Sequence, residues 1–373
     1  MPDRAERAER SERAERSERA KRAARRGPAS ARARRATDRR ALLLAAAGLT
    51  LAGAVLAGSV SGGPRGDEPH KSPGHAIAEP AEDGIAPAAE PEPCADGRDP
   101  AESYRAERLA GDAVERIRDR GQLIVGVDQN SYLWGYRSPE TGEIVGFDLD
   151  LVQAIADDLV EEGVLDEDVE NPVKYLAIPT DQRTRAIGDQ EVDMVVRAMS
   201  ITCDRWEEVA FSTAYFETGQ QLLVPRNSPI DGYDASLAGK TVCSAAGSTA
   251  ETWLEHESHG AELVAAPNHL DCLVHVQLGL ADALMTDSAL AAGHIAQDPS
   301  MRLIGEPLTV ESYGVAMNLN DVDLVRWVNA VLEDYRDGGS QSRWAQAADR
   351  WLQGYLYPQG EPPPAPPQPQ YRD

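Results

Sequence analysis

The stretch Val192 to Phe216, VDMVVRAMSITCDRWEEVAFSTAYF, places a cluster of polar side chains directly behind a short apolar run. Residues 194–196 are typical of a buried strand, and Arg197, Ser200 and Arg205 would then follow at the carboxyl end of that strand. Ligands bind at this end of the strands in open α/β sheets. An arginine offers a rigid, permanently charged fork to a carboxylate, and a serine adds a hydroxyl. The stretch therefore predicts half of a pocket for a molecule with a carboxylate, such as an amino acid, although an arginine paired with a surface acid fits the same pattern.

Candidate strands and helices alternate along the chain. Apolar and β-branched runs predict strands at 122–128, 173–178, 192–199, 218–225, 241–245, 262–266, 281–286, 301–305 and 313–319. Helical patterns lie between most of them, most clearly in Phe147 to Val160 and Val322 to Tyr335, where apolar residues recur on one face. This alternation predicts an α/β fold with largely parallel sheets that are covered by helices on both faces.

The composition is that of a globular, acidic protein with unusual ends. At 373 residues the chain is long enough for two folded units with tails, and its formal net charge is −25. Residues 1–40 are instead a basic near-repeat of Arg-Ala-Glu and Arg-Ser-Glu triplets. The mixed signs of this repeat and the acidity of the remainder argue against nucleic acid as a partner.

Residues 41–60 form an uncharged segment rich in Leu and Ala, which predicts an export signal or a membrane anchor. The basic residues before it would hold residues 1–40 in the cytoplasm, as a tail or as an extended signal-peptide n-region, and place the body outside the cell membrane. Arg39-Arg40 fits either a twin-arginine export signal or an ordinary n-region. Because the first cysteine is Cys94, far beyond the apolar segment, we do not expect a lipoprotein.

Two further segments look unable to bury a core. Residues 61–93 are rich in Pro, Gly, Ala and Glu and are expected to form a disordered linker. Residues 357–373 are rich in proline and are expected to form an unstructured tail.

Five pieces of the chain, taken in order, resemble the family 3 solute-binding proteins, the extracytoplasmic receptors of ABC transporters for polar amino acids. Together they lie within Ala113 to Tyr355, and they most resemble the actinobacterial glutamate- and glutamine-type receptors, which share the ITCDRW motif and later paired cysteines. The pieces are LIVGVDQNSYLWGYR (123–137), GEIVGFDLDL (142–151), the MSIT to AYF motif (199–216), VCSAAGSTAE (242–251) and ADALMTD (281–287).

The resemblance implies the type II periplasmic-binding-protein fold, in which two α/β lobes are joined by a two-segment hinge and the ligand lies between them. We expect the first lobe at 94–223 plus 310–356 and the second at 224–309, with crossings near Val224 and Thr309. The implied function is to bind a free polar amino acid, as a monomer, and to deliver it to an ABC permease. No cofactor and no metal are implied.

The resemblance and the chemistry of an amino acid together assign roles to the candidate residues. Arg205 would take the ligand's carboxylate, helped by Ser248 and Thr249 at the start of a helix whose N-terminal amides favour an anion. Asp287 would take the ammonium through charge-assisted hydrogen bonds. Ser248 and Asp287 also fit plain helix caps. The remaining ligand-binding candidates are Asp128, Tyr132, Trp134, Arg197, Ala198 and Ser200.

Three of these candidates lie at the end of the first predicted strand or in the loop after it. Tyr132 and Trp134 would cover the aliphatic part of the ligand, although aromatic residues in such loops are more often packing. Asp128 would either assist the ammonium or hold the loop in place.

Arg197 is the candidate that would set specificity. The charges of Arg197, Arg205 and Asp287 sum to +1, which glutamate or aspartate neutralises and which glutamine or asparagine leaves unpaired. An unpaired charge in a closed cleft costs on the order of 3–5 kcal/mol. The sequence therefore predicts an acidic amino acid over its amide, unless Arg197 pairs internally with an Asp or Glu.

Four cysteines in an exported protein favour disulfides over a metal site, and their spacing contains no CxxC. The lobes implied by the resemblance put Cys203 in the first and Cys243 and Cys272 in the second. A bridge between lobes would block the hinge, so we expect Cys94 to pair with Cys203 and Cys243 with Cys272. Free buried thiols are the alternative.

No motif of a known enzyme class stands out. The chain has no H-E-x-x-H, G-x-S-x-G or P-loop sequence, and His256, His259, His269 and His275 fit solvent-facing helix positions. Some proteins of the implied fold are dehydratases of prephenate-like acids, which leaves an enzyme as a minor alternative. The sharper rival is a membrane-tethered sensor that reports the amino acid to a membrane partner.

Overall fold

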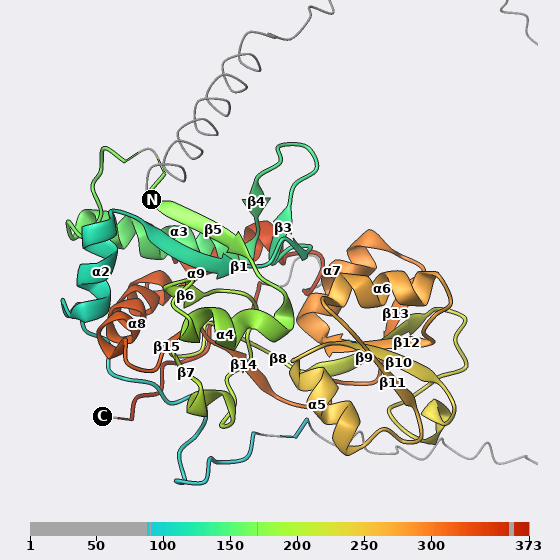
Figure 1. Cartoon of the computed structure of the whole chain (residues 1–373). Coiled ribbons are helices and arrows are strands. Elements are labelled where there is room, and N and C mark those ends of the chain that lie inside the picture. The colour runs from blue at the N-terminus through green and yellow to red at the C-terminus, as the bar shows by residue number, and fades with distance from the viewer. Residues whose placement is uncertain (1–87, 90, 170, 358–361, 373) are drawn as a thin grey trace, which may run out of the picture. The chain divides into compact units, whose positions relative to one another are not determined.

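The computed structural model describes residues 88–89, 91–169, 171–357 and 362–372 (Figure 1). The chain divides into two compact units, Met1–Ala78 and Glu79–Asp373, and all described residues belong to the second. The predictions for residues 1–40 and 41–60, and most of that for 61–93, lie outside the described residues. Among the helices of the described residues, none has the length and apolar content needed to cross a membrane.

The first of two five-stranded sheets builds what we call the first lobe. Its strand order is β5-β1-β6-β15-β7, with β1 parallel to β5 and β6, and β15 antiparallel to β6 and β7. The strands are β5 (Val173–Ala177), β1 (Leu123–Val127), β6 (Met194–Val195), β15 (Ala316–Asn318) and β7 (Val209–Phe211). The helices are α2 (Asp112–Arg120), α3 (Phe147–Glu161), α4 (Arg183–Gly188), α8 (Val322–Arg336) and α9 (Arg343–Trp351).

The first lobe buries the apolar faces that the helical patterns predicted. In α3 and α8 the apolar residues recur on one face and are buried in one large core with the strands. α3 packs against α8, α9 and β1, while α4 packs against β6, β7 and β15. A short antiparallel ribbon, β2 (Asn130–Ser131), β3 (Gly135–Arg137) and β4 (Ile144–Val145), extends from the end of β1.

The second sheet builds the second lobe, with strand order β11-β10-β12-β9-β13. Each face of this sheet is covered by its own apolar core. Leu222 belongs to one core and Leu223 to the other, because successive side chains of a strand point to opposite faces of a sheet. The strands are β11 (Glu262–Ala266), β10 (Thr241–Ala245), β12 (Ala283–Asp287), β9 (Gln220–Pro225) and β13 (Met301–Ile304). The helices are α5 (Thr249–His256), α6 (His269–Gln277) and α7 (Ser288–Gln297).

The chain crosses between the lobes at Gly219 and Thr309, not near Val224. Two crossing strands, β8 (Phe216–Thr218) and β14 (Glu311–Tyr313), pair antiparallel with each other. Between β8 and β9 lies Gly219, where a Cβ would stand 1.9 Å from the carbonyl oxygen of Thr309. The chain thus bends where only glycine fits, and the predicted strand 218–225 is split. Residues 220–223, assigned to the first lobe from the sequence, belong to the second sheet.

Both predicted disulfides are present. Cys94 is bonded to Cys203, and Cys243 to Cys272, which leaves no free cysteine. The first bridge fastens the N-terminal extension to the first lobe, and the second joins β10 to α6. Neither bridge spans the hinge, so both are compatible with movement of the lobes.

The prediction of an unstructured C-terminal tail is wrong for residues 362–372. The backbone of Ser103 donates to Gln370 and accepts from Arg372, at 3.0 and 2.9 Å. The guanidinium of Arg372 lies 3.8 Å from the ring centroid of Tyr104, and Tyr371 donates to Glu333. Prolines cannot join a ladder, but the aromatic and charged residues after them anchor the segment to the first lobe.

Candidate functional site

A cavity between the lobes gathers residues from the ends of several strands. Its residues enclose about 250 Å³ of space between atoms, open solvent included, and little of it is wide enough for a water molecule, so the lobes must part to admit a ligand. Six of the ten candidates from the sequence line it, namely Ala198, Ser200, Arg205, Ser248, Thr249 and Asp287. The other lining residues are Thr180, Arg183, Gln220, Ala250, His269 and Thr286.

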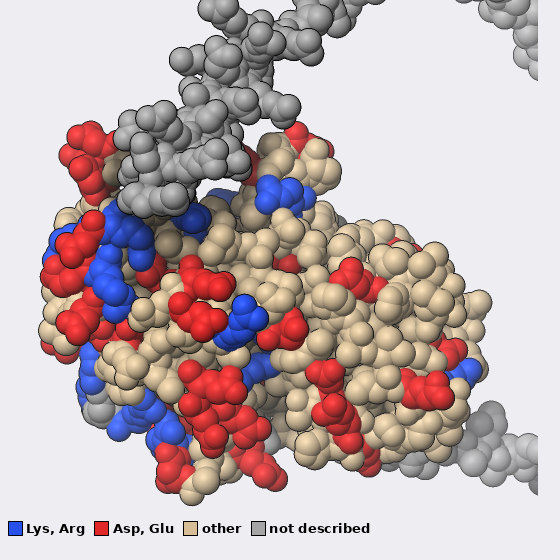
Figure 2. Space-filling view, in the orientation of Figure 1, with Lys and Arg blue, Asp and Glu red and all other residues tan. Residues whose placement is uncertain are grey.

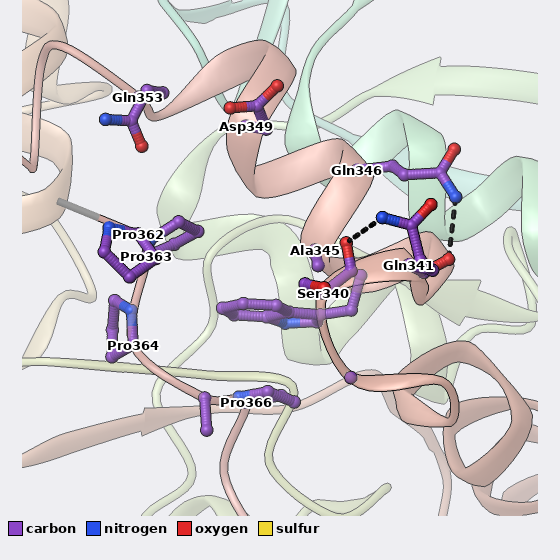
Figure 3. A pocket seen from close by; sticks show the side chains of 13 residues that line it. Ser340, Gln341, Ala345, Gln346, Asp349, Gln353, Pro362, Pro363, Pro364 and Pro366 are labelled. Atoms are coloured by element: carbon purple, nitrogen blue, oxygen red, sulfur yellow. Dashed lines mark hydrogen bonds between the residues drawn. The ribbon is translucent and has the colours of Figure 1, made fainter. Parts of the chain in front are cut away.

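A wider cavity lies elsewhere, between α9 and the proline-rich tail (Figure 3). Pro362 to Pro366 form one side of it, and Gln341, Gln346 and Asp349 form the other. Its single charged lining residue is Asp349, so it lacks the paired charges that recognise an amino acid. We therefore place the functional site between the lobes.

Arg205 reaches from the first lobe to the second. It begins the short helix η2 (Arg205–Glu207), and its guanidinium donates to the carbonyl oxygens of Ser200 and Gly247 at 2.7 and 2.9 Å. Burial lowers the pKa of Arg205, and the nearby carboxylates of Glu311 and Asp287 oppose that shift. Arg205 therefore lines the cavity, and its role in binding a carboxylate stays a prediction.

Arg183 is a second arginine of the cavity that the sequence interpretation missed. It begins α4, is 4% exposed, and donates to the carbonyl oxygens of Thr180 and Gly247 at 2.8 and 3.2 Å. Burial lowers its pKa well below the usual range, with further lowering from Arg205 and then Arg197. Arg183 follows the carboxyl end of β5, so the rule that singled out Arg197 and Arg205 could have found it.

The loop after β10 supplies the start of α5 as an anion site. Ser248 is the N-cap of α5, and its hydroxyl accepts from the amide of Glu251 at 3.2 Å. Thr249 donates its hydroxyl to Glu311 at 2.8 Å. The hydroxyl proton of Thr249 is therefore engaged within the protein, whereas Ser248 keeps its hydroxyl proton for a carboxylate, together with the amides of the first turn of α5.

Asp287 ends β12, with 5% of its surface exposed. Its carboxylate accepts from the side chains of Gln220 and Tyr313, the latter at 2.5 Å, and makes no cap bond to α7. Burial raises the pKa of Asp287 to about 7, with Glu311 the next cause. A carboxylate so disposed to take a positive charge suits an ammonium group.

Arg197 does not line the cavity, which corrects its predicted role. Its guanidinium pairs with Asp128 at 2.9 Å, and the two side chains are 2% and 4% exposed. It also donates to Asn268 of the second lobe at 3.0 Å. Asp128 accepts further bonds from the amides of Gln129 and Asn130. The internal pairing that the sequence left open is present, so Arg197 adds no net charge to the site, and Asp128 holds the loop.

The aromatic residues after β1 also serve packing. Trp134 is fully buried, its ring meets Phe147, Phe216 and Tyr313 edge-on, and its indole donates to the carbonyl oxygen of Ala289 at 3.0 Å. Tyr132 lies against the rings of Tyr136 and Tyr355. Neither side chain lines the cavity, because Trp134 is buried among other aromatic rings and Tyr132 is half-buried on the loop.

His269 is buried at the cavity rather than facing solvent, which corrects the sequence prediction for this residue. It is 7% exposed, and its Nδ1 shares a hydrogen bond of 3.1 Å with the hydroxyl of Thr286. Burial lowers the pKa of His269 well below its usual range, so the ring is neutral. Among the described residues, no group of three or more His, Cys, Asp or Glu side chains is placed to hold a metal ion.

Surface charge offers no sign of a polyanion site on the face in view. Figure 2 shows basic and acidic side chains mixed over the first lobe, and mostly uncharged residues with scattered acids over the second. Polyanion binding uses a basic patch or stripe. The positive charge of the cavity, by contrast, comes from the guanidinium groups of Arg183 and Arg205, which lie between the lobes.

Comparison with known proteins identifies the family. Residues 123–354 match the bacterial extracellular solute-binding proteins, family 3. The glutamine-binding protein of Geobacillus stearothermophilus is 33% identical over 202 residues, 54% of this chain and 74% of that protein. The glutamate-binding protein GluB of Corynebacterium efficiens is 28% identical over 239 residues, 62% of this chain and 80% of that protein.

The fold is shared as well. The crystal structure of the P235GK mutant of ArgBP from T. maritima superposes with a TM-score of 0.58 at 28% identity, covering 65% of this chain and 99% of that chain. This likeness and the two α/β lobes confirm the predicted fold class. The chain belongs to the family 3 bacterial extracellular solute-binding proteins, which bind amino acids and work with ABC permeases.

Proposed function

We propose that the protein binds a free acidic amino acid, glutamate or aspartate, outside the cell membrane and delivers it to an ABC permease. The observation that carries the proposal is the pair Arg183 and Arg205 lining one small cavity together with Asp287. These groups match the two carboxylates and the ammonium of such a ligand.

The charges of the lining favour an acid over its amide. Arg183 and Arg205 offer one guanidinium to each carboxylate of an acidic amino acid, while Asp287 would take its ammonium. Glutamine would leave one guanidinium unpaired, at a cost on the order of 3–5 kcal/mol. Glu311 stands behind Gln220 and Thr249 and does not line the cavity. The relatives include glutamine-binding and glutamate-binding proteins, so their names alone do not decide between the two.

Binding would draw the lobes together. Arg183 and Arg205 belong to the first lobe, whereas Asp287 and the start of α5 belong to the second. A ligand that contacts both sets has a higher affinity for the closed arrangement and shifts the population towards it. Closure would then present the loaded receptor to its permease. The same contacts hold a bound ligand rather than transform it, so we expect a receptor and not an enzyme.

A membrane-tethered sensor is the second candidate, and one contact favours it. The amide of Ala89 donates to the carbonyl oxygen of Leu308 at 2.9 Å, and Ala89 accepts from the amide of Val310 at 3.0 Å. The segment that leads back towards the N-terminus therefore pairs with the residues just before the crossing strand β14. A tether attached at the hinge suits a protein that reports closure to a membrane partner.

A thermal-shift screen of the twenty amino acids with the full-length protein tests the proposal. A specific ligand raises the melting temperature in proportion to site occupancy. We expect glutamate or aspartate to give the largest shift and arginine to give none. A larger shift with glutamine than with glutamate would overturn the acidic assignment, and no shift with any amino acid would overturn the function.

A further inference from the structure

A second buried carboxylate stands directly beside Asp287. Glu311 begins β14 and is 8% exposed. The side-chain amide nitrogen of Gln220 donates to both carboxylates, at 3.1 Å to Glu311. Two carboxylates that share one donor nitrogen are separated by only a few ångströms, and two such groups cannot both ionise easily in a buried site.

The donors around this pair are neutral. Tyr313 donates to Asp287 at 2.5 Å, and Thr249 donates to Glu311 at 2.8 Å. The two arginines of the cavity donate their hydrogen bonds to backbone carbonyl oxygens instead. In the part of the chain that the structure describes, no Lys or Arg nitrogen lies within 4.0 Å of either carboxylate. The pair therefore lacks a close cation of its own.

Gln220 has an unused acceptor at the same place. It is 1% exposed and lines the cavity, and its carbonyl oxygen has no hydrogen-bond partner among the described residues. A buried acceptor without a partner destabilises the free protein, and an ammonium N–H would supply the missing hydrogen bond. Its backbone is fixed by the other crossing segment, since its amide donates to Thr309 and its carbonyl accepts from Leu308.

We propose that Asp287 and Glu311 share one proton in the free protein and that the ligand's ammonium displaces it, with Gln220 completing the ammonium site. The inference rests on the proposed function, because it needs a ligand with an ammonium group. The ammonium keeps its own three protons, the carboxylic acid loses one to solvent, and the charge of the pair changes from −1 to −2 as the ammonium arrives. Each binding event thus releases one proton.

The titration behaviour of the surrounding groups is consistent with this exchange. Burial, then Glu311, raises the pKa of Asp287 to about 7, while Tyr313, Arg205 and Arg183 act in the opposite direction. His269 and His294 are kept neutral by burial, which lowers the pKa of His294 to about 4.

Asp148 is the other group whose pKa burial raises to about 7. It bonds Tyr215 and the amide of Ala198, and it does not line the cavity. The proton shared by Asp287 and Glu311 is therefore the one that titrates between pH 6 and 8 beside the ligand. Asp148 titrates in the same range but contacts other protein groups.

Calorimetric titration of the full-length protein with glutamate, in two buffers of different ionisation enthalpy, measures the protons released. Because the pair is protonated below about pH 7 in the free protein, we expect about one proton released per ligand at pH 6.0 and almost none at pH 8.5. Affinity should correspondingly fall by up to about tenfold per pH unit below 7.

Two variants test whether the released proton comes from the pair Asp287 and Glu311 or from another acidic residue. Glu311→Gln should reduce proton release at pH 6.0 to less than half and flatten the pH dependence, whereas Glu306→Gln, an exposed acid on the same stretch, should match the wild type. Gln220→Met removes the bridge and the free acceptor and should weaken binding about tenfold or more at both pH values.

The outcomes discriminate between the two proposals. Glutamate binding by the wild type without any buffer dependence at pH 6.0 overturns the proton exchange and leaves the proposed function intact. Equal proton release by Glu311→Gln and Glu306→Gln overturns the role of Glu311. If Glu311→Gln does not fold, the wild-type measurement alone decides. Failure of the wild type to bind any amino acid overturns the proposed function itself.

Discussion

Arg205 of the first lobe donates a hydrogen bond of 2.9 Å to the carbonyl oxygen of Gly247 in the second lobe, and Arg183 donates to the same oxygen. One backbone atom thus aligns both guanidinium groups across the cavity. The loop that presents this oxygen also begins α5, so we expect the two arginines and the helix N-terminus to bind the carboxylates of the ligand together. Small changes in that loop should affect affinity more than stability.

Gly247→Ala tests the alignment. Gly247 has a φ of 72°, and a Cβ there would stand 2.9 Å from the Cα of Asp181 in the first lobe. The lobes would have to separate, so glutamate affinity should fall at least about tenfold, with a loss of about 1–2 kcal/mol in the free energy of unfolding. Calorimetry and denaturant unfolding measure the two quantities.

Gly239→Ala is the matched control, since Gly239 has a φ of 70° but open space around the added methyl. It should lose similar stability and keep its affinity. Equal loss of affinity in both variants would contradict the role of Gly247 in closure.

The buried pair Asp128–Arg197 should govern stability and not selectivity. Arg197→Met leaves the Asp128 carboxylate buried without its cation, which costs on the order of 3–5 kcal/mol. The double variant Asp128→Asn/Arg197→Met should recover part of that loss in denaturant unfolding. The ratio of glutamate to glutamine affinity should stay within about threefold of the wild-type ratio. A larger change would show that Arg197 contributes to ligand selectivity.

The two disulfides should differ in their contribution to stability. The cysteines of Cys94–Cys203 are 109 residues apart and those of Cys243–Cys272 are 29 apart. On the chain-entropy account, replacing each pair by serine costs about 4–5 and about 3–4 kcal/mol, respectively. Denaturant unfolding of the two double variants measures the difference. A greater loss from the shorter loop would show that the entropy of the unfolded chain does not dominate.

The sequence predicted the fold class and much of the site because both follow short-range rules. Arg205, Ser200 and Asp287 stand at strand ends, where the carboxyl edge of a sheet directs side chains to a ligand. The alternation of strands and helices placed both sheets. The disulfide pairing followed once the lobes were assigned, because a bridge across a hinge is excluded.

What the sequence interpretation missed depends on contacts between distant segments. Arg197 and Arg183 occupy similar positions after strands, and only the three-dimensional structure shows that Asp128 neutralises the first and leaves the second at the cavity. The burial of His269 likewise requires the neighbouring strand. The boundary at Gly219 depends on the close approach of Thr309, which no local pattern reveals.

The C-terminal tail shows the same limit. Its prolines predict an extended chain, and its anchoring depends on Gln370 and Arg372 meeting Ser103 and Tyr104, more than two hundred positions earlier. Composition alone does not contain that information.

The central claim is that Arg183 and Arg205, opposed by Asp287, select an acidic amino acid. Calorimetric titration of the wild type and of Arg183→Gln with glutamate and with glutamine, at pH 8.5, tests it most directly. Arg185→Gln is the control, because Arg185 lies on the same helix with an exposed side chain paired to Asp189. We predict that the wild type and Arg185→Gln bind glutamate at least about tenfold more tightly than glutamine and that Arg183→Gln loses this preference. Tighter binding of glutamine by the wild type, or an unchanged preference in Arg183→Gln, would contradict the claim.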